Sequence, residues 1–327
     1  MYLILTLIAL VAYELLYFAL AKRLHIVDRP NERSSHRRVV LLGAGIIFFL
    51  ALLHYALFVP GGRAALPAGY LPFLGAAALL AAVSYADDLH PLPGWLRLLV
   101  QAAAIVIALY ASISTLHVWQ MLLLVIVFAG VLNVYNFMDG INGMLAAYSL
   151  VVVGAFLFIN LFVTPFVDTW LLVTILLAVA VFGFFNFRTN ARCFSGDVGS
   201  IVMGFTVVYL LVRYDAALPD NGENVSFLCF IIVFLADGLL TVAKRFLAGR
   251  NILEAHREHL YETLVNELRV PHLRVAAGYA LLQLAVTAGY LLVDDKNLYT
   301  FVVACLLVVA YGLFFNYCNR RGLLPRS

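Results

Sequence analysis

The chain has 327 residues, of which 64% are hydrophobic and only 12% charged, and its formal net charge is +3. Soluble globular domains carry about 25% charged residues, so this composition excludes an ordinary soluble protein and indicates an integral membrane protein. The small positive charge does not predict a nucleic-acid partner, because membrane orientation and anionic lipid account for the basic residues.

Long apolar stretches predict the transmembrane helices. A spanning helix needs roughly 17–25 mostly apolar residues, and eleven stretches meet this length, near 1–20, 40–59, 70–86, 95–113, 117–134, 143–163, 169–186, 198–213, 225–243, 274–293 and 298–316. The first has no basic segment before it and no evident cleavage site after it, so we expect an anchor helix rather than a removed signal peptide. The expected fold is all-α, a single membrane domain over residues 1–327 with ten or eleven spans.

The distribution of Lys and Arg predicts the orientation of these helices, since cytoplasmic loops carry an excess of both residues. If the loop 21–39 is cytoplasmic, alternation places all but Arg63, Arg213 and Lys296 of the 21 basic residues inside. We therefore expect an outside N-terminus and a cytoplasmic C-terminus. The expected cytoplasmic loops are 21–39, 87–95, 134–142, 187–198 and 244–273.

Nearly every unusual polar cluster falls on this cytoplasmic side. The clusters are "DRPNERSSHRR" (28–38), "YADDLHPLPGWLRLLVQ" (85–101), "NVYNFMDGING" (133–143), "NFRTNARCFSGDVGS" (186–200) and "GRNILEAHREHLYETL" (249–264). Taken singly they have ordinary explanations, such as helix caps for the acids or the positive-inside bias for the basic loops. Ionisable groups beside membrane spans are costly and tend to mark function, so five clusters on one face predict a shared cytoplasmic cleft.

The residue types in these clusters suit phosphate chemistry. Carboxylates from Asp87 and Asp88, Asp139 and Asp197 come from three segments, and Mg²⁺ binds to one or two carboxylates together with substrate phosphates. His256, Arg257 and His259 offer donors for phosphate oxygens. The glycines of "SGDVGS" allow a close backbone approach to an anion at the start of a helix.

In this order, the five clusters resemble the polyprenyl-phosphate N-acetylhexosamine-1-phosphate transferase superfamily, the bacterial glycosyltransferase family 4 type. The matching features are the pair Asp87–Asp88 after the third span, the NxxN(F/L)xDG segment at 133–140, the turn "FSGDVGS" and the loop "AHREHLY". The resemblance implies a helical bundle with a cytoplasmic cleft. It also implies transfer of a sugar 1-phosphate from a UDP-sugar, with UDP-N-acetylglucosamine as the default, to undecaprenyl phosphate in the bacterial plasma membrane. The "AHREHLY" form is most like enzymes of O-antigen, capsule or related surface glycans.

The resemblance also implies roles for individual residues. Asp197 would ligate Mg²⁺ with Asn136 nearby, and Mn²⁺ is the alternative metal. Asp87 would act as the base or orient the lipid phosphate, Asp88 would support the phosphates or the metal, and Asp139 would organise the nucleotide side. His256, Arg257 and His259 would stabilise the diphosphate. The expected substrate-binding residues are Asn133, Asn136, Asn142, Phe194, His36 and Arg38.

The first loop departs from the family pattern. After "SSH" the family has a PTxRGGG-like run, and here Leu42 stands in place of the basic residue and Ala44 in place of a glycine. Arg37 or Arg38 would then have to supply the phosphate contact. The altered loop leaves open an inactive relative that scaffolds glycan assembly. A polytopic secondary transporter also stays open, because many hydrophobic spans with a few intramembrane charges are expected of that class too. Monomer and homodimer are both open.

Overall fold

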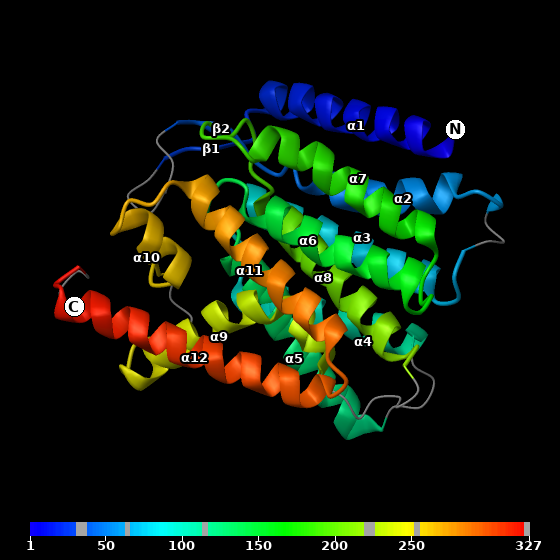
Figure 1. Ribbon diagram of the computed structural model, residues 1–327. Helices are drawn as coiled ribbons and strands as arrows, with labels where there is room; N and C mark the ends of the chain where they lie inside the picture. The colour runs from blue at the N-terminus through cyan, green and yellow to red at the C-terminus, as the bar shows by residue number, and fades with distance from the viewer. Residues whose placement is uncertain (31–37, 63–65, 113–116, 219–225, 252–255, 324–327) are drawn as a thin grey trace.

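The structure is a computed structural model that describes residues 1–30, 38–62, 66–112, 117–218, 226–251 and 256–323. It is almost entirely helical (Figure 1). The helices are α1 (Tyr2–Leu24), α2 (Ile46–Phe58), α3 (Tyr70–Leu89), α4 (Gly94–Ser112), α5 (Val118–Phe137), α6 (Met144–Phe162), α7 (Thr169–Asn186), α8 (Gly196–Asp215), the 3₁₀ helix η2 (Ser226–Ile231), α9 (Ile232–Leu247), α10 (Leu260–Asn266), α11 (His272–Leu292) and α12 (Lys296–Arg320). Two short strands, β1 (Val27–Asp28) and β2 (Val40–Leu41), complete the fold.

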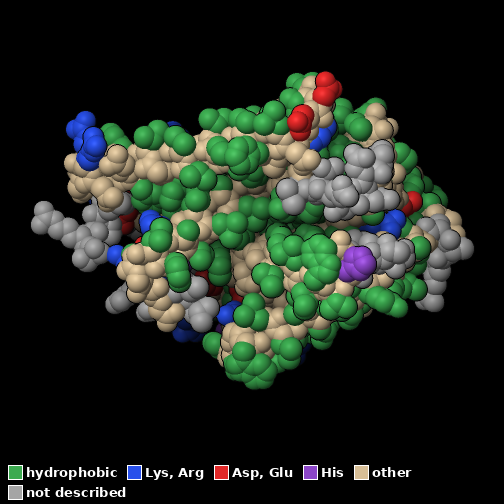
Figure 2. All heavy atoms as spheres, turned by 90° about the horizontal axis from the view of Figure 1, so that it is seen from below, with side chains coloured by type: hydrophobic (Ala, Val, Ile, Leu, Met, Phe, Trp, Pro, Cys, Tyr) green, Lys and Arg blue, Asp and Glu red, His purple; other side chains and the backbone are tan. Residues whose placement is uncertain are grey.

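Within the described ranges, ten helical segments are long and apolar enough to cross a membrane. The prediction of an all-α, multi-pass membrane protein is therefore confirmed. Large apolar side chains stay exposed on the outer helices, for example Leu16 and Phe301, and Figure 2 shows hydrophobic side chains spread over much of one face. Such a surface suits lipid, because lipid tails solvate it without the cost that water would impose.

The predicted span 40–59 is wrong in its length. Only α2 is helical there, and its 13 residues rise about 20 Å, well short of a hydrocarbon core about 30 Å thick. The preceding apolar residues instead form β2 and a turn. In this turn the amide of Ala44 donates to the carbonyl of Phe194 at 3.0 Å and that of Gly45 to Ser195 at 3.0 Å. Backbone pairing with a distant loop therefore replaces the first turns of the expected helix.

Helix α8 lies at the centre of the bundle. It packs against α2, α3, α4, α5 and α6, and 83% of its apolar 18-residue stretch is buried. The N-terminus of the chain lies at one end of the bundle, and β1, β2, α10 and the C-terminal end of α12 lie at the other (Figure 1, left). At that end β1 pairs with β2 in antiparallel register, and Leu41 bridges to Cys193 in the loop before α8.

Span nine is broken where η2 passes into α9. A break leaves backbone groups without helical partners, and inside a membrane these must be satisfied by neighbouring side chains. Gln283 of α11, fully buried, does this: its Nε2 donates to the carbonyl of Cys229 at 2.9 Å, and its Oε1 accepts from the amide of Val233 at 3.3 Å and from the Tyr148 hydroxyl at 2.6 Å.

Replacing Gln283 by Leu should therefore destabilise the fold. The change leaves buried groups of Cys229, Val233 and Tyr148 unpaired, at about 1–3 kcal/mol for each group that finds no new partner. We expect a clearly lower thermal unfolding midpoint in detergent than for the wild type. Leu282→Ala, at an exposed position of the same helix, is the control; equal midpoints for Gln283→Leu and wild type would contradict this account.

Candidate functional site

Two acids from different helices meet around one arginine. Asp87, near the end of α3, accepts hydrogen bonds from Nη1 of Arg97 at 2.8 Å and from the amide of Leu92 at 2.6 Å. The same Nη1 lies 3.4 Å from Oδ2 of Asp197, in the first turn of α8. Two carboxylates this close repel each other unless a cation lies between them, and Arg97 provides that positive charge.

Asp88 holds the start of α8 from another helix. Its Oδ1 accepts from the amide of Asp197 at 2.8 Å and its Oδ2 from the amide of Val198 at 3.1 Å. The first amides of a helix have no partner within the helix, so Asp88 acts as their cap. Gly196 is required here, because its φ of +70° is left-handed and a Cβ would overlap the Asp88 carboxylate.

Asn136 joins the end of α5 to this group. Its Nδ2 donates to Oδ1 of Asp197 at 2.8 Å and to the hydroxyl of Ser200 at 3.0 Å. Because Nδ2 makes both bonds, the amide oxygen is the atom of Asn136 that can serve as a metal ligand. Carboxylate and amide oxygens are the donors that Mg²⁺ and Mn²⁺ prefer, so the chemistry of Asp197, Asp87 and Asn136 fits the predicted metal.

Asp139 is tied to the loop before α8. The hydroxyl of Ser195 donates to Oδ2 of Asp139, and Ser195 itself is buried. Burial raises the pKa of Asp139 to about 8, against the effect of the Ser195 hydrogen bond, which lowers it. The carboxyl is therefore largely protonated at neutral pH in this state of the protein.

This pKa predicts how stability depends on pH. An Asp in the unfolded chain ionises near pH 3.9, whereas folded Asp139 holds its proton to about pH 8. The folded state thus binds more protons, and its stability falls as pH rises through this window, by up to about 1.4 kcal/mol per pH unit. We expect the thermal midpoint in detergent to fall between pH 5 and 8.

Asp139→Asn should remove much of that slope, because Asn can still accept the Ser195 bond but does not titrate. A residual slope is expected from the other buried carboxyls, among them Glu262, whose pKa burial raises to about 7. Equal slopes for wild type and variant would show that Asp139 is ionised throughout the range.

A pocket opens beside the acids, between α3, α4, α5 and α8. Its lining residues are Leu80, Val83, Ser84, Arg97, Val100, Gln101, Asn133, Asn136, Asp197 and Ile201. The lining combines charged and amide groups with aliphatic side chains. Asn133 contributes here: its Nδ2 donates to Gln101 at 2.8 Å and to the carbonyl of Ala129 at 2.8 Å.

The other residues predicted to bind substrate either lie outside the lining of this pocket or lie outside the described residues. Asn142 donates to the carbonyls of Arg188 at 2.9 Å and Thr189 at 3.2 Å, so its amide holds the loop after α7. Phe194 is half-buried in the loop before α8. Arg38 is exposed at the start of the segment that leads to β2. His36 and Arg37 lie outside the described residues.

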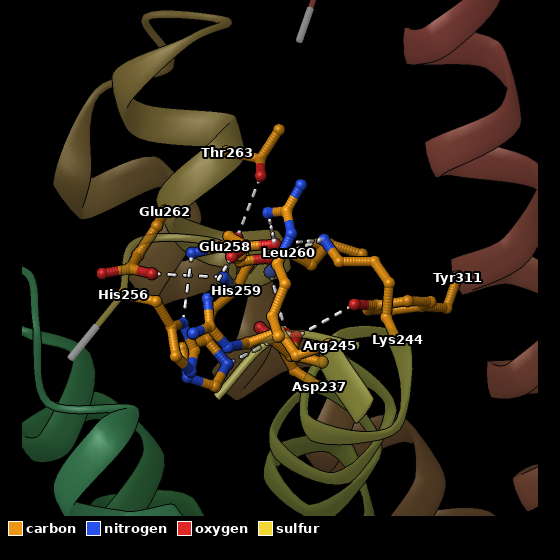
Figure 3. Close-up of polar contacts among 12 residues, drawn as sticks. Asp237, Lys244, Arg245, His256, Glu258, His259, Leu260, Glu262, Thr263 and Tyr311 are labelled. Carbon is orange, nitrogen blue, oxygen red and sulfur yellow. Dashed lines mark hydrogen bonds and ion pairs between the residues drawn. The ribbon is translucent and has the colours of Figure 1, made fainter. Parts of the chain in front are cut away.

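The loop that precedes α10 is clamped to the end of α9. The carboxylate of Glu258 forms ion pairs with Nη1 of Arg245, with Nη1 of Arg250 at 3.0 Å and with Nζ of Lys244 at 3.6 Å. Figure 3 shows Lys244 and Arg245 reaching it. Burial acts to raise the pKa of Glu258, but these cations lower it. The clamp fixes the residues on either side of Glu258.

His256 and Arg257 offer unused donors. Nδ1 of His256 accepts from the amide of Glu258 at 3.4 Å, which leaves the ring proton on Nε2. Burial, with nearby His259 and Arg245, lowers the pKa of His256 to about 4, so the ring is neutral at pH 7. Arg257 has two buried donors, Nε and Nη2, without a hydrogen-bond partner among the described residues. Buried donors without partners are rare in native proteins, and an anion would satisfy these.

A second group with metal-binding atoms lies in the same loop. Side-chain atoms of His256, His259 and Glu262 all lie within 4.8 Å of one another. Binding a metal through Nε2 of His256 would require loss of the bond to the Glu258 amide, since a neutral ring has one unprotonated nitrogen. The tautomer set by that bond favours a donor role for His256.

The segment 256–259, called here the His loop, and the start of α10 lie against the end of α5, next to Asp139. The hydroxyl of Tyr261 donates to the carbonyl of Phe137 at 2.8 Å, and the rings of Phe137 and His259 are 6.0 Å apart. Gly140, next to Asp139, leaves room for Tyr261, because a Cβ there would overlap its hydroxyl. The structure thus brings segments that are far apart in sequence to one end of the bundle.

Three residues of this arrangement were not singled out from sequence. Arg97 carried a signal: a cation in the first turn of a helix is unfavourable beside the helix dipole unless an anion is near. Asp237 was a lone acid inside the apolar span 225–243, which is itself an indication of function. Ser195 carried no signal, since its partner Asp139 is distant in sequence.

Comparison with known proteins shows which sequences this chain is similar to. A profile described as glycosyl transferase family 4 matches residues 70–215, which hold the acids, Asn133, Asn136 and Arg97 but neither the first loop nor the His loop. The chain is 26% identical to undecaprenyl-phosphate alpha-N-acetylglucosaminyl 1-phosphate transferase of Escherichia coli K12, over 94% of this chain and 88% of that protein.

Two further relatives carry similar names. The protein of the same name from Yersinia pestis is 25% identical over 92% of this chain and 86% of its own length. Decaprenyl-phosphate N-acetylglucosaminephosphotransferase of Mycobacterium leprae is 25% identical over 80% of this chain and 77% of its own. The resemblance predicted from the motifs is confirmed as a similarity: residues 70–215 match glycosyl transferase family 4, and the relatives that match most of this chain are named as polyprenyl-phosphate N-acetylglucosamine-1-phosphate transferases.

Proposed function

We propose that this protein transfers N-acetylhexosamine 1-phosphate from a UDP-sugar, UDP-N-acetylglucosamine first, to undecaprenyl phosphate. The products are undecaprenyl-diphospho-N-acetylhexosamine and UMP, and the step would begin a bacterial surface glycan such as an O-antigen or capsule. The observation that carries the proposal is the group Asp87, Arg97 and Asp197 with Asn136 beside it, from four helices. Names of relatives that match nearly the whole chain support it.

The reaction needs one bond formed and one broken. An oxygen of the lipid phosphate attacks the phosphorus that carries the sugar, and the bond between that phosphorus and the oxygen bridging to UMP breaks, so UMP leaves with the bridging oxygen. In such transfers the protein forms few or no covalent bonds to the substrates; it positions them and neutralises their charge.

The roles follow from the contacts of each residue. Asp197 and Asn136 would hold Mg²⁺, which would neutralise charge on the diphosphate when bound. Asp88 acts through Asp197, because both its oxygens hold the start of α8. Asp87 would orient the lipid phosphate. Arg257, with its free donors, and neutral His256 would hydrogen-bond the phosphates on the UMP side.

The pocket beside the acids suits the lipid acceptor. A prenyl phosphate needs a polar end for its head group and an apolar wall for its chain. Arg97, Asn136 and Asp197 offer the polar end, and Leu80, Val83, Val100 and Ile201 the apolar wall. We place this site on the cytoplasmic face of the bacterial plasma membrane, from the excess of Lys and Arg in the loops at this end.

A transfer assay tests the function. Purified protein would be incubated with undecaprenyl phosphate and a panel of radiolabelled UDP-N-acetylhexosamines, with Mg²⁺, with Mn²⁺ or with EDTA. We expect metal-dependent label in the lipid phase and release of UMP. No transfer from any donor by a monodisperse, folded protein would count against the enzyme and favour the scaffold or transporter alternatives.

A further inference from the structure

Asp237 is a buried acid that the proposed reaction does not use. It lies in α9 and is 4% exposed. A carboxylate inside a membrane span is expensive unless every oxygen finds partners. Its partners therefore indicate what the residue does.

Within the described residues, two of its four hydrogen-bond partners are amides at the start of α10, and the other two are hydroxyls of α11 and of α9 itself. Oδ1 of Asp237 accepts from the amide of Leu260 at 2.8 Å, and Oδ2 accepts from the amide of Tyr261 at 3.2 Å. The hydroxyl of Tyr279 in α11 donates to Oδ2 at 2.7 Å, and Thr241 donates to Oδ1 at 3.2 Å. Asp237 thus caps α10 from another helix, directly after His259.

The imidazole of His259 also faces this carboxylate. Its Nδ1 lies 3.6 Å from Oδ1 of Asp237, which is an ion-pair distance rather than a hydrogen bond. The ring is 3% exposed, and Nδ1 is a buried atom with no hydrogen-bond partner among the described residues, so this carboxylate is the acceptor that faces it. The ring also packs against the rings of Tyr261 and His256, with centroid distances of 5.8 Å and 5.0 Å. A carboxylate beside one ring nitrogen keeps the proton on that nitrogen and leaves the other to act on a ligand.

We infer that Asp237 is the positioning residue of the His loop: it caps α10, orients His259 through Nδ1–H and leaves Nε2 free to take up a proton and then donate it in a hydrogen bond to the reacting phosphates. The inference rests on the proposed function for the role of His259 in transfer, whereas the orientation of the ring follows from the contacts alone. Asp237 itself does not touch substrate.

A double-mutant cycle tests this role. Asp237→Asn should lower kcat about 10- to 100-fold, by analogy with residues that orient ligating histidines, and should change KM for the UDP-sugar less than about threefold. In a His259→Ala background the same change should cost nothing more, since coupled residues are non-additive. An equal loss in both backgrounds, or no loss in either, would overturn the inference.

Two further variants guard against misfolding. Tyr279→Phe removes a bond to Oδ2 of Asp237, the oxygen that does not face His259, with little change of shape, and we expect near-normal kcat. Thr241→Val removes a side-chain bond to Oδ1, the oxygen that faces His259, so if Asp237→Asn does not fold, Thr241→Val takes its place in the cycle. A loss of kcat in Thr241→Val that persists without His259 would then count against the role.

A spectroscopic measurement separates this inference from the proposed function. In ¹⁵N-histidine spectra, the signal missing in His259→Ala identifies His259, and we expect Nδ1 to be protonated in the wild type and to lose that preference in Asp237→Ala. An unprotonated Nδ1 in the wild type would overturn the inference. If His259→Ala keeps full transferase activity while Nδ1 behaves as expected, the assigned role of His259 in transfer fails and the orientation by Asp237 stands.

Discussion

Asp197→Asn should lower the rate of transfer about a thousandfold while leaving the fold intact. Asn can still accept the hydrogen bond from Asn136 but carries no charge for a metal ion. Loss of a metal ligand at a phosphoryl-transfer site removes several kcal/mol of transition-state stabilisation, so we expect kcat to fall about a thousandfold, or roughly 4 kcal/mol. The measurement is the lipid-phase transfer assay, with the thermal midpoint taken in parallel.

Asp215→Asn is the matched control for this variant. It makes the same chemical change in the same helix, α8, about 27 Å away along the axis. We expect it to keep near-normal activity. A folded Asp197→Asn protein with wild-type activity would refute the site, and a wild type without transferase activity would turn attention to a transporter.

Asp87→Asn should lose rate far more than donor affinity. Asp87 is the acid that Arg97 contacts more closely, and the proposed role is to orient the lipid phosphate. Its loss should lower kcat about a hundredfold or more, the scale of a lost general base or positioning group, with a small change in KM for the UDP-sugar. Equal losses in kcat and in donor affinity would place Asp87 on the donor instead.

The neighbouring acid provides a contrast. Both oxygens of Asp88 accept from amides at the start of α8, and an Asn there would turn an NH₂ group toward one of them. Asp88→Asn should therefore lower the rate and also the free energy of unfolding, the latter by about 1 kcal/mol as for other lost caps. The second effect would be seen as a lower thermal midpoint. If Asp88→Asn lowers stability and Asp87→Asn does not, then Asp88 supports the helix and Asp87 acts on the substrate.

The first loop is still joined to the rest of the protein, although Leu42 and Ala44 stand where the family has a basic residue and a glycine. Ala44 is fully buried, and its amide pairs with the carbonyl of Phe194 in the loop before α8. The hydroxyl of Tyr17 in α1 donates to the carbonyl of Leu42 at 2.5 Å. Backbone bonds therefore join this segment to the site, and these bonds do not depend on the side chains that differ.

Hydropathy and charge by themselves determined the class of protein, the approximate spans and the polar clusters at their ends. These are local properties: an apolar run long enough to cross lipid must be helical, because no other isolated segment satisfies its own backbone there. The run 40–59 shows where local reasoning fails. Residues 40–45 are apolar, yet pairing with residues 193–195 forms strand and turn instead of helix.

The tertiary structure alone decided which residues act on one another. Asp87 and Asp88 are adjacent in sequence, but one meets Arg97 and the other caps α8. Asp237 reaches the His loop only because α9 packs against α10 and α11. Residue types predict what chemistry a segment can perform, whereas partners depend on how helices pack, and no periodicity within a single helix encodes that.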